Sequence, residues 1–197
     1  MLTKLRPIAR NIIKPIALFF VKIGASPNHV TVLGLITALM VPVLFYYKHG
    51  VVAILLFAIS SLLDAVDGEV ARITGKKTEF GAFLDSTSDR IEDSSYIISL
   101  YILGINYLIV SILLVASIII SYTRARAEAL NVKMEGIGII ERAERLILVF
   151  AIIVLLYINQ LTIALAITCI LILLSIITIV QRIIHVYREL SSSSRNQ

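Results

Sequence analysis

Residues 64–89 read DAVDGEVARITGKKTEFGAFLDSTSD, and four aspartates in this stretch determine how the chain is interpreted. Asp64 and Asp67 are three positions apart, and Asp85 and Asp89 are four positions apart. On an α-helix, residues at either spacing lie on the same face. Two helices that face each other would therefore bring four carboxylates to a common centre.

The rest of the chain is typical of an integral membrane protein. Of its 197 residues 58% are hydrophobic, and the mean hydropathy is +0.94, which excludes the soluble globular class. Carboxylates within membrane spans are costly, so a cluster of four requires a reason. Hard oxygen ligands suit Mg²⁺, Mn²⁺ or Ca²⁺ and argue against zinc. We therefore predict a divalent-cation site; the alternative is a set of acids that cap helices at the membrane surface.

Uncharged runs locate the membrane spans. Asp, Glu, Lys and Arg are absent from residues 23–47, 49–63, 94–123 and 146–181. The last run is long enough for two spans of roughly 18 residues each, with Asn159-Gln160 between them. The fold class that follows is an all-α integral membrane protein with six transmembrane helices. These spans are expected at about 28–47, 51–73, 80–103, 107–130, 140–158 and 161–188.

The distribution of charge predicts the orientation in the membrane. The connections at 48–50, 104–106 and 159–160 contain a single basic residue, Lys48. By the positive-inside rule the opposite side is cytoplasmic, and both termini and the aspartates lie on that side. We therefore predict a multi-pass protein of the cell membrane with a cytoplasmic active site.

The two ends of the chain differ from the six spans. Basic residues alternate with leucine and isoleucine in residues 1–24, which predicts an amphipathic helix in the cytoplasmic interface. Residues 25–190 are expected to form one six-span domain, and residues 191–197, SSSSRNQ, a disordered tail. The basic face of the first segment is suited to anionic headgroups. We expect membrane lipid, and no nucleic acid, among the partners.

The aspartates also belong to a longer pattern. The arrangement Asp64-x2-Asp67-Gly68-x2-Ala71-Arg72-x8-Gly81-x3-Asp85-x3-Asp89 resembles the signature of the CDP-alcohol phosphotransferase family at every fixed position. The resemblance implies an enzyme that transfers the phosphate of a CDP-linked lipid to an alcohol and releases CMP. It also implies a homodimer. Two Mg²⁺ or Mn²⁺ ions held by the four aspartates would activate the attacking oxygen and stabilise the leaving one.

The segment between the aspartate pairs is suited to a nucleotide diphosphate. Gly68 lets the backbone approach a phosphate, Arg72 offers a bidentate fork, and Lys76, Lys77 and Thr78 add charge and a hydroxyl. In the family that this chain resembles, positions matching Gly68, Arg72 and Thr78 contact CDP. Asp89 is the deepest of the four carboxylates, and the resemblance makes it the general base as well as a metal ligand.

A second segment carries the same resemblance. Pro27-Asn28-His29-Val30-Thr31 is similar to the family motif that precedes the first span and touches the CDP-lipid. The resemblance therefore adds Asn28, His29, Val30 and Thr31 to the donor-binding residues. The alternative is a helix start with an Asn or Ser cap.

Arginines at several predicted helix ends suggest a site for a phosphorylated acceptor, because Arg binds phosphate in a bidentate manner. The alternative is that they flank the spans and reach to the interface. The segments GAFLDSTSDR (81–90), SYTRARAE (121–128), ERAERL (141–146) and QRIIHVYR (181–188) resemble the inositol-phosphate branch of the family. We predict that the acceptor phosphate is bound by Arg124, Arg142, Arg145, Arg182 and Arg188.

The resemblance implies 1L-myo-inositol 1-phosphate as acceptor, with glycerol 3-phosphate as the alternative. Isoleucine is abundant, which favours an archaeal chain and CDP-archaeol as donor. CDP-diacylglycerol stays open, because the groove for the lipid tails is apolar in either case. Outside this class, a divalent cation carrier that uses the aspartates as a transit site is the rival, although carriers usually place such sites near the bilayer midplane.

Overall fold

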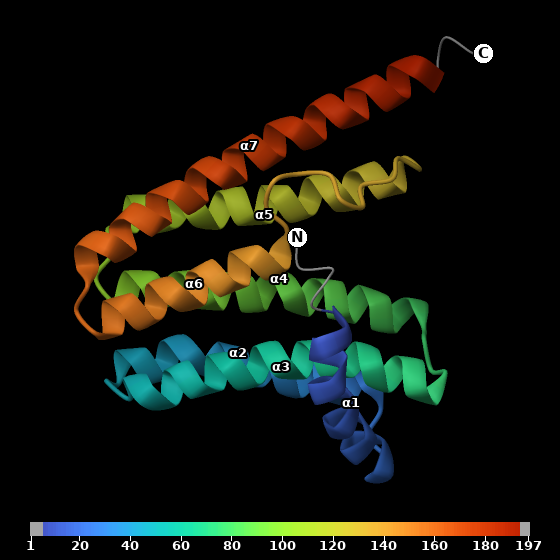
Figure 1. Cartoon of the computed structure of the whole chain (residues 1–197), viewed down its shortest axis with the longest axis horizontal. Coiled ribbons are helices and arrows are strands. Elements are labelled where there is room, and N and C mark those ends of the chain that lie inside the picture. The colour runs from blue at the N-terminus through green and yellow to red at the C-terminus, as the bar shows by residue number, and fades with distance from the viewer. Residues whose placement is uncertain (1–5, 194–197) are drawn as a thin grey trace. The chain divides into compact units, whose positions relative to one another are not determined.

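The computed structural model describes residues 6–193 (Figure 1). Within this range the chain forms helices and no strands, which confirms the all-α fold class. The helices are α1 (Arg6–Lys22), α2 (Pro27–Tyr46), α3 (Gly50–Thr74), α4 (Glu79–Ile102), α5 (Tyr107–Ala129), α6 (Arg142–Tyr157) and α7 (Leu161–Ser193). Each of the six predicted spans corresponds to one helix from α2 to α7. Residues 1–5 of the predicted interfacial helix and 194–197 of the predicted tail lie outside the described residues.

Four of these helices are long and apolar enough to cross a membrane: α2, α3, α5 and α7. The other two differ for physical reasons. α4 carries charged side chains over more than half of its length, from Glu79 to Asp93, and α6 has 16 residues. At about 1.5 Å of rise per residue, α6 is shorter than the hydrocarbon layer of roughly 30 Å.

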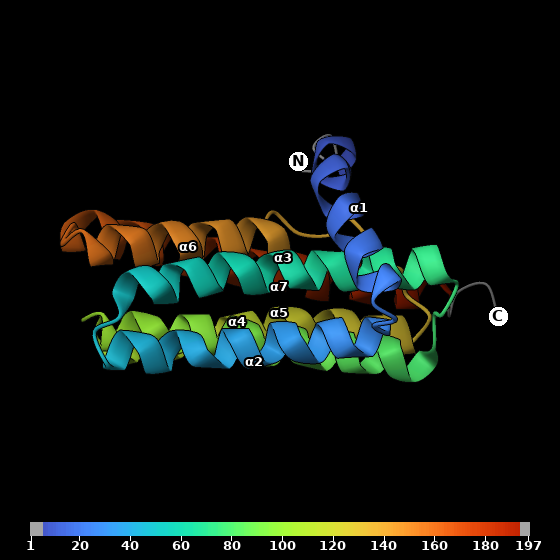
Figure 2. The same ribbon diagram turned by 90° about the horizontal axis from the view of Figure 1, so that it is seen from below.

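The chain forms two compact units, of which the first ends at Ile102 and the second begins at Leu103. In the first unit α2 packs along both α3 and α4, and α1 lies across α3 (Figures 1 and 2). Ala17 of α1 and Val30 of α2 are buried against Val66 and Val70 of α3. This contact sets the start of α2 beside the end of α3.

Small residues and serines hold α2 against its neighbours. The Ser60 hydroxyl donates to the Gly34 carbonyl oxygen at 2.7 Å, and the Ser95 hydroxyl donates to that of Ala38 at 2.9 Å. A Cβ on Gly34 would lie 3.5 Å from Leu63 Cβ and 3.5 Å from Glu92 Oε1. Gly and Ala four residues apart allow this close approach, as is common between membrane helices.

In the second unit α5 and α6 both pack against α7. The contact face of α7 is a seam of fully buried side chains that recur with helical periodicity: Ala164, Thr168, Leu171, Ser175 and Thr178. Residues 130–141, which we call the α5–α6 loop, connect α5 to α6. Thr178 and Arg182 of α7 are hydrogen-bonded to the backbone of this loop.

Candidate functional site

The two aspartate pairs lie on either side of a short connection between α3 and α4. Gly75 ends α3 in the left-handed conformation, with φ of 66°, which glycine adopts without strain. The Thr78 hydroxyl accepts a hydrogen bond from the Gly81 amide at 2.9 Å and so caps the start of α4. The chain therefore reverses within four residues, and the last turns of α3 lie near the first turns of α4.

Three of the four predicted ligands come together. One carboxylate oxygen of each of Asp64, Asp85 and Asp89 lies within 4.8 Å of the other two. None of the three residues is fully buried. Carboxylate oxygens at this separation are the donor set that Mg²⁺ or Mn²⁺ prefers, so the residues present fit a hard divalent cation.

Asp67 is held differently from the other three aspartates. It is buried, with 5% of its surface exposed, and accepts a hydrogen bond of 2.6 Å from the Thr31 hydroxyl. Its carboxylate is not part of the group of three. The bond ties α3 to α2 and gives Asp67 one fixed orientation beside Asp85, with which it lines a common cavity.

That cavity has a volume of about 240 Å³ and lies in the first unit between the start of α2, the end of α3 and the start of α4. Four of the residues predicted to bind the CDP-lipid line it: Asn28, Thr31, Gly68 and Thr78. Gly81 is tightly placed here, because a Cβ would lie 3.0 Å from Thr78 Oγ1 and 3.1 Å from Asn28 Oδ1. Gly81 thus lets α4 begin against α2.

The other predicted donor-binding residues do not line this cavity. His29 belongs to the cap of α2: its Nδ1 accepts from the Ser26 amide, and its own amide donates to Ser26 Oγ, both at 3.3 Å. Val30 is buried in the core of the unit. Arg72 forms an ion pair with Glu69 on the same helix. Residues 27–31 therefore form the first turns of α2, with Ser26 as the cap. This is the helix start that the sequence offered as the alternative.

Two of the arginines predicted to bind the acceptor are buried in the second unit. Arg145 and Arg182 have 3% and 4% of their surface exposed. Arg182 donates from Nε to the Ile137 carbonyl oxygen at 3.1 Å and from Nη1 to that of Ile120. The charges of Arg124 and Arg145 are within electrostatic reach of Arg182.

The remaining predicted arginines lie at helix ends. Arg124 is half exposed and forms an ion pair of 2.8 Å with Glu128, one turn further along α5. Arg142 is the first residue of α6, and Arg188 is exposed near the end of α7. The structure thus gathers Arg124, Arg145 and Arg182 in one region of the second unit.

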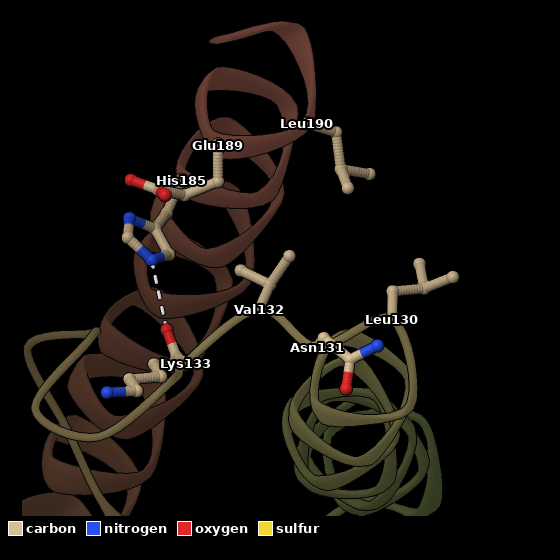
Figure 3. Close-up of a pocket in the computed structure, with 7 residues that line it drawn as sticks. All are labelled: Leu130, Asn131, Val132, Lys133, His185, Glu189 and Leu190. Atoms are coloured by element: carbon tan, nitrogen blue, oxygen red, sulfur yellow. Dashed lines mark hydrogen bonds between the residues drawn. The ribbon is translucent and has the colours of Figure 1, made fainter. Parts of the chain in front are cut away.

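A larger cavity of about 680 Å³ lies elsewhere in the second unit (Figure 3). It is lined by Leu130, Asn131, Val132, Lys133, His185, Glu189 and Leu190, none of which was predicted as a site residue. Its charged side chains are one acid, Glu189, and one lysine, Lys133, so its charge favours no particular ligand. We assign the chemistry to the smaller cavity beside the aspartates.

A sequence model described as CDP-alcohol phosphatidyltransferase matches residues 25–186, which cover the aspartates, the cavity and every predicted arginine but Arg188. The chain belongs to this family. It is 41% identical over 175 residues to the archaetidylinositol phosphate synthase of Aeropyrum pernix, a match that covers 89% of this chain and 90% of the relative.

Solved structures support this family membership. Phosphatidylinositol phosphate synthase of Mycobacterium tuberculosis with CDP-DAG bound is similar with a TM-score of 0.78 and 33% identity, over 90% of this chain and 94% of that one. The same enzyme in complex with manganese and citrate is similar with a TM-score of 0.77 and 33% identity, over 89% and 88% of the two chains. The chain is therefore a member of a family of membrane transferases, and its acidic cluster fits divalent metal.

The sequence contained three further contributors to the site, Gly81, Lys76 and Lys77, but did not show where they lie. Gly81 was part of the signature, but its role in joining α2 to α4 depends on a contact across 53 positions of the chain. Lys76 and Lys77 both line the cavity, although only their charge had been noted. The two lysines lie between Gly75, which ends α3, and Thr78, which caps α4. This position was the signal in the sequence that could have placed them at the cavity.

Proposed function

We propose that the chain transfers the lipid phosphate of a CDP-lipid to 1L-myo-inositol 1-phosphate, giving an inositol phosphate lipid and CMP. The observation that carries the proposal is the position of Asp64, Asp85 and Asp89 in the same unit as a cavity lined by Asn28 and Gly68. Donor binding and cation binding would thereby meet at Asp85, which belongs to both sets of residues.

Asp64, Asp67, Asp85 and Asp89 would hold two Mg²⁺ or Mn²⁺ ions. Such ions, when bound, neutralise the charge of the diphosphate and stabilise the leaving group. The hydrogen bond from Thr31 would orient the Asp67 carboxylate as a ligand. Gly68 and Ala71 leave room for the diphosphate on the cavity wall.

The transfer requires a base, for which we propose Asp89. The acceptor hydroxyl oxygen attacks the phosphorus that carries the lipid, the bond from that phosphorus to the CMP oxygen breaks, and Asp89 takes the hydroxyl proton. Arg90 lies close to Asp89, with 3.9 Å between Nη1 and Oδ2. Arg124, Arg142, Arg145, Arg182 and Arg188 would bind the acceptor phosphate, and the proximity of three of them in the second unit supports this assignment.

For the donor residues that do not line the cavity, we propose two different roles. His29 and Val30 would act on the donor through the position of α2, because one caps that helix and the other anchors it in the core. Arg72 is exposed at the end of α3, and its ion pair with Glu69 would exchange for a contact with the donor phosphate.

We further propose that α4 and α6 cross the membrane with the other four helices, giving six spans. The short connections at residues 47–49, 103–106 and 158–160 support this arrangement, because Lys48 is their single charged residue. α1 would lie in the cytoplasmic interface, since Ile12, Leu18 and Phe19 are exposed while Ala17 is buried. Both termini and the active site would face the cytoplasm, and resemblance to the family supports a homodimer.

The decisive experiment supplies purified protein with CDP-archaeol or CDP-diacylglycerol, each with inositol 1-phosphate or glycerol 3-phosphate, in the presence of Mg²⁺ or Mn²⁺. CMP release and the product lipid are measured together. We expect CMP release with inositol 1-phosphate as acceptor, at a higher rate with CDP-archaeol than with CDP-diacylglycerol. Chelation of the divalent cation should abolish this turnover. Preference for glycerol 3-phosphate would refute the proposed acceptor, and Mn²⁺ uptake into vesicles without CMP release would favour a carrier.

A further inference from the structure

The α5–α6 loop is fastened to α7 by three side chains on one helix face. Thr178 Oγ1 accepts a hydrogen bond of 3.2 Å from the Ile140 amide, and Arg182 donates to the Ile137 carbonyl oxygen. His185 Nε2 is hydrogen-bonded to the Lys133 carbonyl oxygen at 3.1 Å (Figure 3). Positions 178, 182 and 185 are spaced as one stripe of an α-helix, so the loop follows α7 for about two turns.

The tightest point of this attachment is Gly138 against Thr178. Gly138 has a φ of +122°, which side-chain-bearing residues rarely adopt, and a Cβ there would lie 2.5 Å from Thr178 Cγ2. Thr178 is fully buried. The loop backbone therefore rests directly on the threonine, and no larger residue fits at position 138 without displacing it.

The attachment ends where α6 begins. Ile140, which is bonded to Thr178, directly precedes Glu141, the N-cap of α6. The Glu141 amide donates to Glu144 Oε2 at 3.2 Å, and the Glu141 carbonyl oxygen accepts from the Arg145 amide at 3.1 Å. The first turn of α6, with Arg142 and Arg145, is thus tied through Ile140 to α7.

We propose that Thr178 and Gly138 are positioning residues for the acceptor-binding arginines of α6. Neither residue bears charge, and Thr178 acts through its bond to Ile140 rather than through the substrate. The inference rests on the proposed function, because it assigns Arg142 and Arg145 to the acceptor phosphate. If the arginine pair is displaced, the acceptor is bound more weakly in the ground state and in the transition state by the same amount. Such a loss raises the KM for the acceptor and leaves kcat unchanged.

The test compares Thr178→Val with Thr168→Val. Both threonines are fully buried on α7, but the Thr168 hydroxyl donates to the Ala164 carbonyl oxygen of its own helix and holds no loop. Thr178→Val leaves the buried Ile140 amide without its acceptor. We expect the KM for inositol 1-phosphate to rise roughly tenfold, with kcat and the KM for CDP-lipid unchanged; this is the change expected if the free-energy cost of one unsatisfied buried amide is expressed in acceptor binding. Thr178→Ser, which keeps the hydroxyl, should restore the wild-type KM.

A second pair of variants tests the same contact from the loop side. Gly138→Ala should raise the KM for the acceptor, because the added Cβ meets Thr178 Cγ2. Thr178→Ser removes that methyl group, so the double variant should recover part of the loss. Such recovery would be specific to the contact between residues 138 and 178. If the two substitutions acted independently, their free-energy effects on acceptor binding would simply add.

The outcomes separate the two proposals. If the wild-type protein does not use inositol 1-phosphate, the proposed function fails. If it does, and Thr178→Val has the kinetics of Thr168→Val, or raises the KM values of donor and acceptor alike, the positioning inference is overturned. Should Thr178→Val be too unstable to purify, the ratio of acceptor KM to donor KM in Gly138→Ala, alone and with Thr178→Ser, gives the same decision.

Discussion

The hydrogen bond between Thr31 and Asp67 provides a quantitative test of the cation site. It is 2.6 Å long, both residues are buried, and it joins α2 to α3. A hydrogen bond to a charged group contributes about 1.5–3 kcal/mol. At about 1.4 kcal/mol per factor of ten, Thr31→Val should change an equilibrium that depends on this bond by roughly 10- to 100-fold.

The equilibrium to measure is Mn²⁺ binding, by calorimetry on the purified protein without CDP-lipid, so that donor binding does not contribute. We expect Thr31→Val to weaken Mn²⁺ binding by about tenfold or more, because partners that orient a metal ligand typically have effects of this size. Thr31→Ser keeps the hydroxyl and should bind Mn²⁺ as the wild type does. Thermal unfolding of each variant shows how much of the effect is a general loss of stability.

The matched control is Thr37→Val. The Thr37 hydroxyl, also on α2, donates to the carbonyl oxygens of Leu33 at 3.0 Å and Gly34 at 2.7 Å, within its own helix. Its removal should leave Mn²⁺ binding unchanged. Equal Mn²⁺ affinities for the two valine variants would refute the view that Thr31 orients a cation ligand, and Asp67 would then be a structural acid.

Three further outcomes are expected. Asp89→Asn should lower kcat by roughly 10²- to 10⁴-fold with unchanged thermal unfolding, because a positioned base typically has that effect; turnover within a few-fold of wild type would exclude Asp89 as the base. Lys76→Ala combined with Lys77→Ala should raise the KM for CDP-lipid several-fold and leave that of inositol phosphate unchanged, whereas Lys48→Ala, outside the cavity, should change neither. Gly81→Ala should raise the donor KM and lower stability by about 1 kcal/mol in chemical unfolding, because the new Cβ crowds Thr78 and Asn28.

Helix positions could be predicted closely from the sequence. The span expected at 51–73 is the helix Gly50–Thr74, and that expected at 80–103 is Glu79–Ile102. Breaks in hydrophobicity coincide with glycine or a short polar connection, so the ends are marked locally. The span expected from residue 140 instead begins at Arg142, because Ile140 belongs to the loop that Thr178 holds. Apolar residues used by a loop look the same in sequence as those of a helix.

Contacts between distant residues could not be predicted in the same way. The spacing of the aspartates predicted two pairs on two helix faces, and three of these carboxylates do gather. That Asp67 accepts a bond from Thr31, 36 positions earlier, depends on how α2 packs on α3. Among the arginines, Arg145 and Arg182 are buried and Arg124 is half exposed. Arginines that flank a membrane span and arginines that line a site have the same sequence context, so burial separates them only in the structure.

The two units divide the predicted chemistry. The eight signature residues, from Asp64 to Asp89, belong to the first unit, and the five predicted acceptor arginines, from Arg124 to Arg188, belong to the second. The donor diphosphate and its cations make the same demand whichever alcohol attacks, whereas the two candidate acceptors differ in size and in the number of hydroxyl groups that accompany their common phosphate. Specificity for the acceptor is a difference between two binding free energies, and only groups that touch the acceptor or position such groups change it. Substitutions in the α5–α6 loop should therefore shift the preference between inositol and glycerol phosphates at constant Mn²⁺ affinity. A first-unit variant that shifted this preference without altering donor KM would contradict the division.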